Sequence, residues 1–315
     1  MKALGLERVE DFGRDLDRPE CVHCTAQGDV FVSDWRGGVT RIRPDGSQQL
    51  IRGRGKLVKT NGFAILPDCS FLLAHLDDEE GGVWRLALDG ALTPWMEGLP
   101  PTNFVHVHGE RTYVTVSTRA VPRHLARKPG HADGFIVLRD SRGTRTVADG
   151  LGFTNECKVD PSGQWLYVNE TIAKRLSRHR IAPDGDLGAR ETCAEFGHGV
   201  FPDGLDFDAE GGIWITSIYS NRLIRIAPDG RQTVVVEDND PDFVDSLETR
   251  FARGELTSGG HPPVPARRIR NLSSSAFGGP DLRTLYLGCL QDSRIYRMPS
   301  PVAGARPPHW DVRFP

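Results

Sequence analysis

The sequence predicts an all-β fold, a single six-bladed β-propeller with a central metal site. One pattern recurs six times: a polar residue, a short alternating run, a turn with Gly or Asp, and a second apolar run. Most units continue into a third strand that ends at an Asp-Gly type turn. Period-two runs bounded by such turns are typical of β-hairpins, and three or four strands in roughly forty to fifty residues are typical of a propeller blade.

The six units follow one another from the first blade to the last. They begin with PECVHC at Pro19, TNGFAI at Thr60, TNFVHV at Thr102, TNECKV at Thr154, PDGLDF at Pro202 and SSSAFGG at Ser273. Second strands are expected from Val30, Phe71, Thr112, Trp165, Ile213 and Thr284. Closing turns after third strands end at Gly46, Gly90, Gly185 and Gly230. Because the spacing is so regular, residues 1–315 are expected to form one domain.

Two segments do not fit the repeat. RAVPRHLARKPGHADGF, residues 119–135, is too long for a tight hairpin, and an ordered long loop on a rigid scaffold is often a lid. A polar insertion at 238–268 separates the fifth and sixth blades. Within it, Phe243, Leu247 and Phe251 have helical spacing.

Each unit places a polar residue at the start of its first strand, which in a propeller runs along the central channel. These lead residues are Glu20, Asn61, Asn103, Asn155, Asp203 and Ser274. Buried polar groups cost free energy unless they are paired, and two neighbouring carboxylates repel each other. A divalent cation removes that repulsion, and carboxylate and amide oxygens suit Ca²⁺, Mg²⁺ or Mn²⁺; Zn²⁺ and Fe²⁺ remain alternatives. We therefore expect one bound ion, most readily Ca²⁺, on Glu20, Asn155 and Asp203.

Composition argues against several classes of partner. Thirty-nine basic and forty-two acidic residues give a net charge of −3, so neither a nucleic acid nor an anionic membrane is an expected partner. The opening residues lack the apolar core of a secretory signal, and the six cysteines are scattered. A cytoplasmic protein, a monomer or a small homo-oligomer, is expected.

Several motifs together resemble the SMP-30/gluconolactonase/LRE-like family of metal-dependent lactonases. They are RPECVHC around Glu20, NGFAILPD at 61–68, GFTNECKVD around Asn155, FPDGLDFD around Asp203 and AFGGPDLRTLYLG at 276–288. The resemblance implies a Ca²⁺-dependent hydrolase that opens a lactone ring. It also implies that Glu20, Asn155 and Asp203 bind the metal, that Asp203 is the general base, and that Asn103 completes the ligand set or meets the substrate.

The sequence departs from the family pattern at sugar-contacting positions. Pro101 stands where an Arg is common, Glu156 replaces a Gly after Asn155, and Arg18-Pro19 precedes Glu20. Lactone chemistry is thus better supported than a polyol-shaped substrate.

The expected reaction is attack of a water, activated by Asp203, on a metal-polarised carbonyl of a small-molecule lactone. Asn61 and Asn103 are expected to orient the substrate or complete the metal shell. Cations of the 119–135 segment, Arg119, Arg123, His124 and Arg127, are candidate substrate contacts. Two alternatives stay open: another metal-dependent hydrolase on this scaffold, such as a phosphotriesterase, and a non-catalytic propeller that binds a small molecule.

Overall fold

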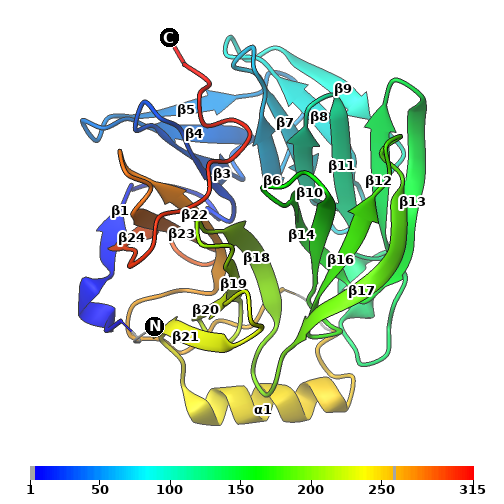
Figure 1. Ribbon diagram of the computed structural model, residues 1–315, viewed down its shortest axis with the longest axis vertical. Helices are drawn as coiled ribbons and strands as arrows, with labels where there is room; N and C mark the ends of the chain where they lie inside the picture. The colour runs from blue at the N-terminus through cyan, green and yellow to red at the C-terminus, as the bar shows by residue number, and fades with distance from the viewer. Residues whose placement is uncertain (1–3, 258–259) are drawn as a thin grey trace.

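The computed structural model describes residues 4–257 and 260–315. These residues form six four-stranded antiparallel sheets around a common axis (Figure 1). The predicted all-β, six-bladed β-propeller is therefore confirmed. Five second strands begin where the repeat places them, at Val30, Phe71, Trp165, Ile213 and Thr284, and the third begins at Arg111, one residue before the expected Thr112.

Blades 1 to 5 each use four consecutive strands. Blade 1 has β2 (Val22–Cys24), β3 (Val30–Asp34), β4 (Gly38–Ile42) and β5 (Gln48–Arg52). Blade 2 has β6 (Thr60–Ile65), β7 (Phe71–His75), β8 (Val83–Leu86) and β9 (Leu92–Met96). Blade 3 has β10 (Thr102–His108), β11 (Arg111–Val116), β12 (Gly134–Asp140) and β13 (Gly143–Leu151). Blade 4 has β14 (Thr154–Val159), β15 (Trp165–Glu170), β16 (Arg175–Ile181) and β17 (Leu187–Glu195). Blade 5 has β18 (Pro202–Phe207), β19 (Ile213–Ser217), β20 (Arg222–Ile226) and β21 (Gln232–Glu237).

Blade 6 joins both ends of the chain. Its inner strands are β22 (Leu272–Gly278), β23 (Thr284–Cys289) and β24 (Ile295–Pro299). The outer strand is β1 (Glu10–Phe12), which follows the 3-10 helix η1 (Leu6–Arg8) and pairs antiparallel with β24, Glu10 opposite Arg297. This pairing closes the ring, because it ties the first strand of the chain to the last.

The inner strands β6, β10, β14, β18 and β22 lie next to one another around the axis (Figure 1). Apolar side chains between neighbouring blades make the core, as where the rings of Phe31 and Phe71 both pack against Phe314. The inner strands approach closely: a Cβ added at Gly62 would lie 2.3 Å from the Phe104 ring. Such spacing brings polar side chains at equivalent positions of different blades within reach of one point.

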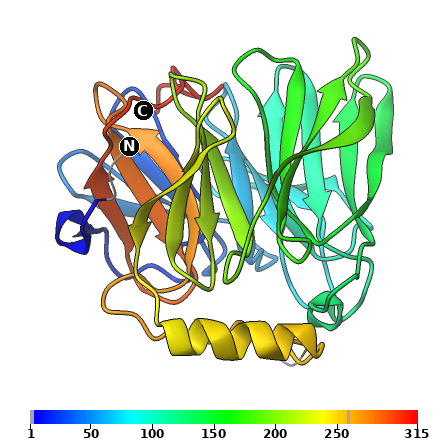
Figure 2. The ribbon, with the colours of Figure 1, turned by 60° about the horizontal axis from the view of Figure 1, so that its bottom comes forward.

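A roof covers one end of the propeller. The insertion predicted at 238–268 contains α1 (Pro241–Ala252), which lies across that end beside the 119–135 segment (Figure 2). Asp240 caps α1 by accepting a hydrogen bond from the backbone N–H of Phe243 at 2.9 Å. The buried residues Leu247 and Phe251 pack in one apolar cluster with Ala126 of the 3-10 helix η2 (Arg123–Ala126). Helix and segment thus form one packed layer.

The expected lid segment is ordered, and its last two residues already belong to β12. Within the described part of the chain, no helix is both long and apolar enough to cross a membrane.

Candidate functional site

The lead residues stand at irregular positions of the inner strands. Asn61, Asn103, Asn155 and Asp203 are each the second residue of their strand, where the register with the next strand shifts. Glu20 precedes β2. Bulges of this kind redirect a side chain and are common beside functional sites. Here they direct polar side chains of successive blades toward the axis.

Four of the lead residues meet at one small chamber. Glu20, Asn103, Asn155 and Asp203 all line a space of about 10 Å³ beneath the roof. All four are buried; Asp203 is 2% exposed. A space of this size holds about one water-sized sphere. The structure therefore brings side chains from blades 1, 3, 4 and 5 to a chamber that suits a single small ligand.

Several oxygens at this chamber have no hydrogen-bond partner among the described residues. They are Oδ1 of Asn103, Oδ1 of Asn155 and Oδ2 of Asp203. The amide of Asn155 is oriented by its Nδ2, which donates to the Thr171 hydroxyl at 3.2 Å. Buried polar atoms are normally paired, so a group of unpaired acceptors indicates a missing cationic or donating partner. The donor set therefore fits a hard divalent cation.

The remaining two lead residues support Glu20 from the side. Asn61 Nδ2 donates to Glu20 Oε1 at 2.8 Å and to the Asn103 carbonyl at 3.0 Å. Ser274 donates from its hydroxyl to the Glu20 carbonyl at 2.5 Å. Asn61 thus fixes the orientation of a carboxylate instead of lining the chamber itself.

The side chains that could bind a metal at the chamber are of two kinds, carboxylates and Asn amides. Within residues 4–257 and 260–315, no three His, Cys, Asp or Glu side chains are placed to hold a metal. Any ion on the axis would instead rely on two carboxylates and on Asn oxygens, which was the composition expected from the sequence. Metal binding therefore remains a prediction.

Three carboxylates, those of Glu20, Glu156 and Asp203, lie near one another in or next to the chamber, where burial and neighbouring charges raise the pKa of Glu156 and Asp203. Burial, and next the charge of Glu20, raise the pKa of Asp203 well above its ordinary value. Burial also raises the pKa of the neighbouring Glu156 to about 8, against the attraction of Lys158. Glu156 Oε2 accepts from the Leu205 backbone N–H at 3.1 Å, so this residue ties blade 4 to blade 5.

Arg18 contributes a cation that the sequence did not assign to the site. Its Nη1 lies 2.6 Å from Glu20 Oε2 and donates to Asn61 Oδ1 at 2.8 Å. Its guanidinium stacks 4.2 Å from the ring centre of Trp35. The departure Arg18-Pro19 at the blade 1 entrance therefore places a positive charge directly beside the expected metal ligand.

A larger cavity of about 400 Å³ adjoins the chamber beneath the roof. Arg18, Arg123 and Arg127 line both spaces, so they separate the cavity from the chamber. His124 lines only the larger cavity. Two of the candidate contacts in the 119–135 segment, Arg123 and Arg127, thus reach the chamber.

Arg119, also named from the sequence, is not among the residues lining these spaces. Its guanidinium pairs with Asp149 at 2.8 Å and stacks over Phe135 at 4.2 Å on the outer side of blade 3. Because its charge is already compensated there, Arg119 holds the base of the loop instead of facing a ligand.

Sequence reasoning missed three further residues at the chamber: Thr171, Tyr219 and His261. Thr171 and Tyr219 follow second strands, in blades 4 and 5, and that shared place in the repeat was an available signal. His261 comes from the 238–268 insertion, and its Nδ1 lies 2.7 Å from the Tyr219 hydroxyl in a hydrogen bond. Burial and the nearby Arg127 lower the pKa of His261 well below its ordinary value, so this imidazole is neutral at pH 7.

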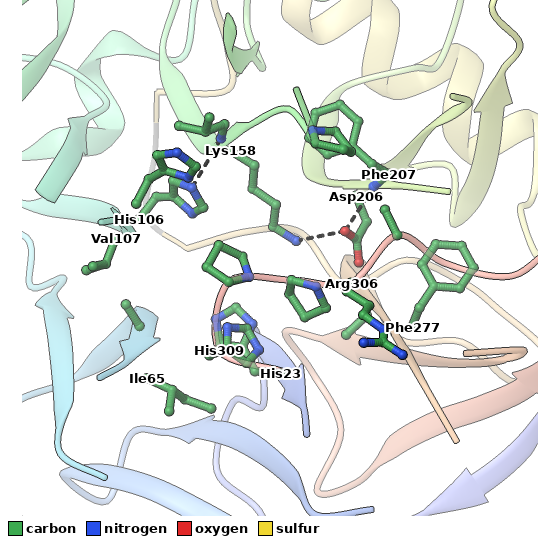
Figure 3. Close-up of a pocket in the computed structure, with 18 of the residues that line it drawn as sticks. His23, Ile65, His106, Val107, Lys158, Asp206, Phe207, Phe277, Arg306 and His309 are labelled. Carbon is green, nitrogen blue, oxygen red and sulfur yellow. Dashed lines mark hydrogen bonds and ion pairs between the residues drawn. The ribbon is translucent and has the colours of Figure 1, made fainter. Parts of the chain in front are cut away.

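A separate cavity of about 290 Å³ opens at the other end of the axis (Figure 3). Its polar groups include several imidazoles, the Arg306 guanidinium and an ion pair between Lys158 and Asp206, with Nζ 3.5 Å from Oδ1. His106 Nε2 accepts from a backbone N–H, and His23 Nε2 bonds the Phe63 carbonyl at 2.7 Å. In contrast to the chamber, this cavity has no cluster of unpaired buried oxygens among the described residues, so the chamber under the roof is the better candidate for a metal-dependent reaction.

Curated relatives match about half of the chain. A 6-deoxy-6-sulfogluconolactonase from Pseudomonas putida is 29% identical over 150 residues, 47% of this chain and 40% of that protein. A pentonolactonase from Haloferax volcanii is 26% identical over 159 residues, 50% of this chain and 45% of that protein. The matched stretch thus spans less than half the length of either relative.

Solved structures share the fold over the whole chain. The calcium-binding protein regucalcin from Agrobacterium tumefaciens has a TM-score of 0.68 at 17% identity, covering 100% of both chains. A gluconolactonase from Xanthomonas campestris has a TM-score of 0.63 at 19% identity, covering 91% of this chain and 88% of that one. Residues 116–238 match the model of the SMP-30/Gluconolactonase/LRE-like region. Residues 116–238 are thus similar to the SMP-30/gluconolactonase/LRE-like family, in agreement with the resemblance seen in the motifs.

Proposed function

We propose that this protein is a hydrolase that opens a lactone ring with the help of one divalent cation. The observation that carries the proposal is the set of unpaired buried oxygens of Asn103, Asn155 and Asp203 around a chamber of about 10 Å³. The names of the relatives, a sulfogluconolactonase and a pentonolactonase, support a small-molecule lactone as substrate.

Glu20, Asn155 and Asp203 would hold the cation, with Ca²⁺ the best fit to oxygen donors and Mg²⁺, Mn²⁺, Zn²⁺ or Fe²⁺ as alternatives. When bound, such an ion supplies Lewis-acid polarisation of the lactone carbonyl. Because Arg18 already contacts Glu20 Oε2, ion binding must compete with or share that ion pair.

The chain's own residues then have distinct tasks. Asp203 accepts the proton of the attacking water, since its Oδ2 is buried and has no partner among the described residues. The Asn103 amide nitrogen, equally unpaired, donates to the carbonyl oxygen as negative charge develops there. Asn61 keeps Glu20 in place, and the roof over the chamber excludes bulk water.

The direct test is a metal-stripped sample to which Ca²⁺, Mg²⁺, Mn²⁺ or Zn²⁺ is returned singly. Lactone opening is followed by the pH drop, and ion binding by the shift of the thermal midpoint. We expect wild type to regain both, and Asp203→Asn and Asn155→Ala to regain neither. Asp206→Asn on the same strand is the matched control, because its carboxylate pairs with Lys158 at the other end. If no ion shifts the midpoint and no lactone is opened by wild type, the proposal is wrong.

The same experiment separates the alternative hydrolase. A protein that cleaves phosphotriesters with the restored ion, while every lactone stays intact, would transfer the assignment to that reaction.

A further inference from the structure

Three arginines surround the space above the chamber. Resting on the proposed lactonase function, we propose that the lactone carries an acidic substituent, a sulfonate, phosphate or carboxylate, and that Arg18, Arg123 and Arg127 bind it. Arg18 comes from the entrance of blade 1 and the other two from the 119–135 segment. All three line both the chamber and the adjoining cavity of about 400 Å³.

These guanidinium groups are not ordinary surface charges. Arg127 is 5% exposed, and its Nη1 donates to the Gly260 carbonyl at 3.3 Å. Arg123 stacks 4.6 Å from the centre of the Phe153 ring and donates from Nη2 to the Ser117 hydroxyl at 3.1 Å. A buried charge is costly unless it is paired, so the partners of the Arg123 guanidinium decide what that residue can do.

Two other part-buried arginines of this propeller, Arg175 and Arg225, have carboxylate partners. Arg225 lies 2.6 Å from Asp208, and Arg175 lies 2.6 Å from Glu170; both carboxylates are fully enclosed. Arg123, in contrast, has no carboxylate within ion-pair distance in residues 4–257 and 260–315, and its Nε has no hydrogen-bond partner there. Unlike Arg175 and Arg225, Arg123 is therefore able to bind the anionic group of a ligand.

The net charge of the chamber also favours an anionic ligand. Its charged lining consists of Arg18, Arg123 and Arg127 against Glu20 and Asp203, three positive charges and two negative. A divalent cation on the two carboxylates would raise the excess to three positive charges. An anionic substituent lowers this excess, and a planar guanidinium matches the oxygens of carboxylate, sulfonate and phosphate groups.

The acidic side chains of the larger cavity do not cancel this field. Asp77 is paired with Lys59, Nζ to Oδ2 at 2.9 Å, and Asp78 is exposed at the rim. Lys59 also lies 5.6 Å from the centre of the Trp35 ring, on which Arg18 stacks. The entrance is therefore close to neutral, and the positive charge lies deeper, next to the reacting centre.

The alternative is that the arginines bind only the carboxylate of the product, which forms whenever a lactone ring is hydrolysed. Gluconate and 6-phosphogluconate separate the two roles, because both carry that carboxylate and differ only in the phosphate. We expect calorimetry on the calcium-loaded protein to show at least about tenfold tighter binding of 6-phosphogluconate, since charge-assisted hydrogen bonds are the strong ones. The difference should shrink with added salt. Equal binding of the two compounds would overturn the proposal.

Variants locate the effect. Arg123→Gln should weaken 6-phosphogluconate binding by about tenfold more than gluconate binding, and Arg127→Gln should do the same. Lys128→Gln is the matched control: it removes one positive charge from the same segment at an exposed position, and the ratio of the two affinities should stay that of wild type. Thermal melts show that each variant is folded. An unchanged ratio in both arginine variants would refute the assignment of these residues.

Kinetics distinguish this inference from the proposed function. We expect kcat/KM for 6-phosphoglucono-1,5-lactone and for the 6-sulfo analogue to exceed that for glucono-1,5-lactone by at least about tenfold. Opening of the neutral lactone at an equal or higher rate would overturn the inference but keep the lactonase. Selective binding of 6-phosphogluconate without opening of any lactone would overturn the lactonase and keep the anion site.

Discussion

Replacing Asp203 by Asn changes the charge of the chamber while nearly keeping its shape. In the metal-free protein the Asp203 carboxylate is buried, and its Oδ2 has no partner among the described residues. Burial and the neighbouring Glu20 raise its pKa in the folded state. A carboxyl whose pKa is higher in the folded protein than in the unfolded chain lowers stability at pH 7, and this cost disappears below both pKa values.

The substitution therefore has two effects of opposite sign. Without metal at pH 7, we expect Asp203→Asn to raise the free energy of unfolding by at least about 1 kcal/mol, because Asn carries no charge to bury beside Glu20 and a one-unit rise in pKa corresponds to that free energy. With an ion at a hundred times its dissociation constant, wild type should gain about 2.7 kcal/mol, whereas the variant loses most of this gain. The ion should thus cancel or reverse the order of stability of the two proteins.

Urea unfolding at pH 7, once with a chelator and once with excess Ca²⁺, measures both effects, and the pH-drop assay measures activity. Asp206→Asn serves as the control and should keep the calcium-induced gain, because Asp206 faces the cavity at the other end of the axis. A metal-free Asp203→Asn protein less stable than wild type, or an equal calcium-induced gain in both, would refute this reasoning.

Other predictions concern the frame around the site. Burial lowers the pKa of His106 to about 3, against about 6.5 in the unfolded chain. Because the unfolded chain then binds a proton that the folded protein does not, this residue should lower the free energy of unfolding of wild type by about 2 kcal/mol between pH 7 and pH 5. In urea unfolding at the two pH values, the free energy of unfolding of His106→Gln should therefore fall by about 2 kcal/mol less than that of wild type. An equal fall in both proteins would contradict the prediction. Leu247→Ala removes a side chain that is 1% exposed in the roof and should cost about 2–5 kcal/mol, with faster hydrogen exchange in α1. A cost below about 1 kcal/mol would mean that the roof is loosely packed. Asp208 accepts from Trp214 Nε1 at 2.8 Å and from Arg225 Nε at 2.6 Å, so Asp208→Ala should cost about 3–5 kcal/mol in unfolding experiments. Asp208→Asn should recover part of this cost, and equal losses in the two variants would contradict the role of the hydrogen bonds.

The sequence by itself determined the architecture and the line of polar residues along the axis. Strand alternation and turn residues are local properties, so a pattern repeated six times shows both the blade and its number. The equivalence of Glu20, Asn103, Asn155 and Asp203 followed from their constant place in the repeat, and the structure brings these four to one chamber. The helical spacing of Phe243, Leu247 and Phe251 similarly indicated α1 within the insertion.

Tertiary structure alone decided which cations face that chamber. Arg119 and Arg123 look alike in sequence, yet Asp149 of β13 holds the first on the outer side of blade 3, while the second enters the space under the roof. Arg18 contacts Asn61, forty-three residues away, and His261 reaches Tyr219 from a non-repeating insertion. The pairing of β1 with β24, which closes the ring, likewise joins segments that are far apart in the sequence. Contacts between distant segments depend on how the blades close around the axis, and no local pattern records that closure.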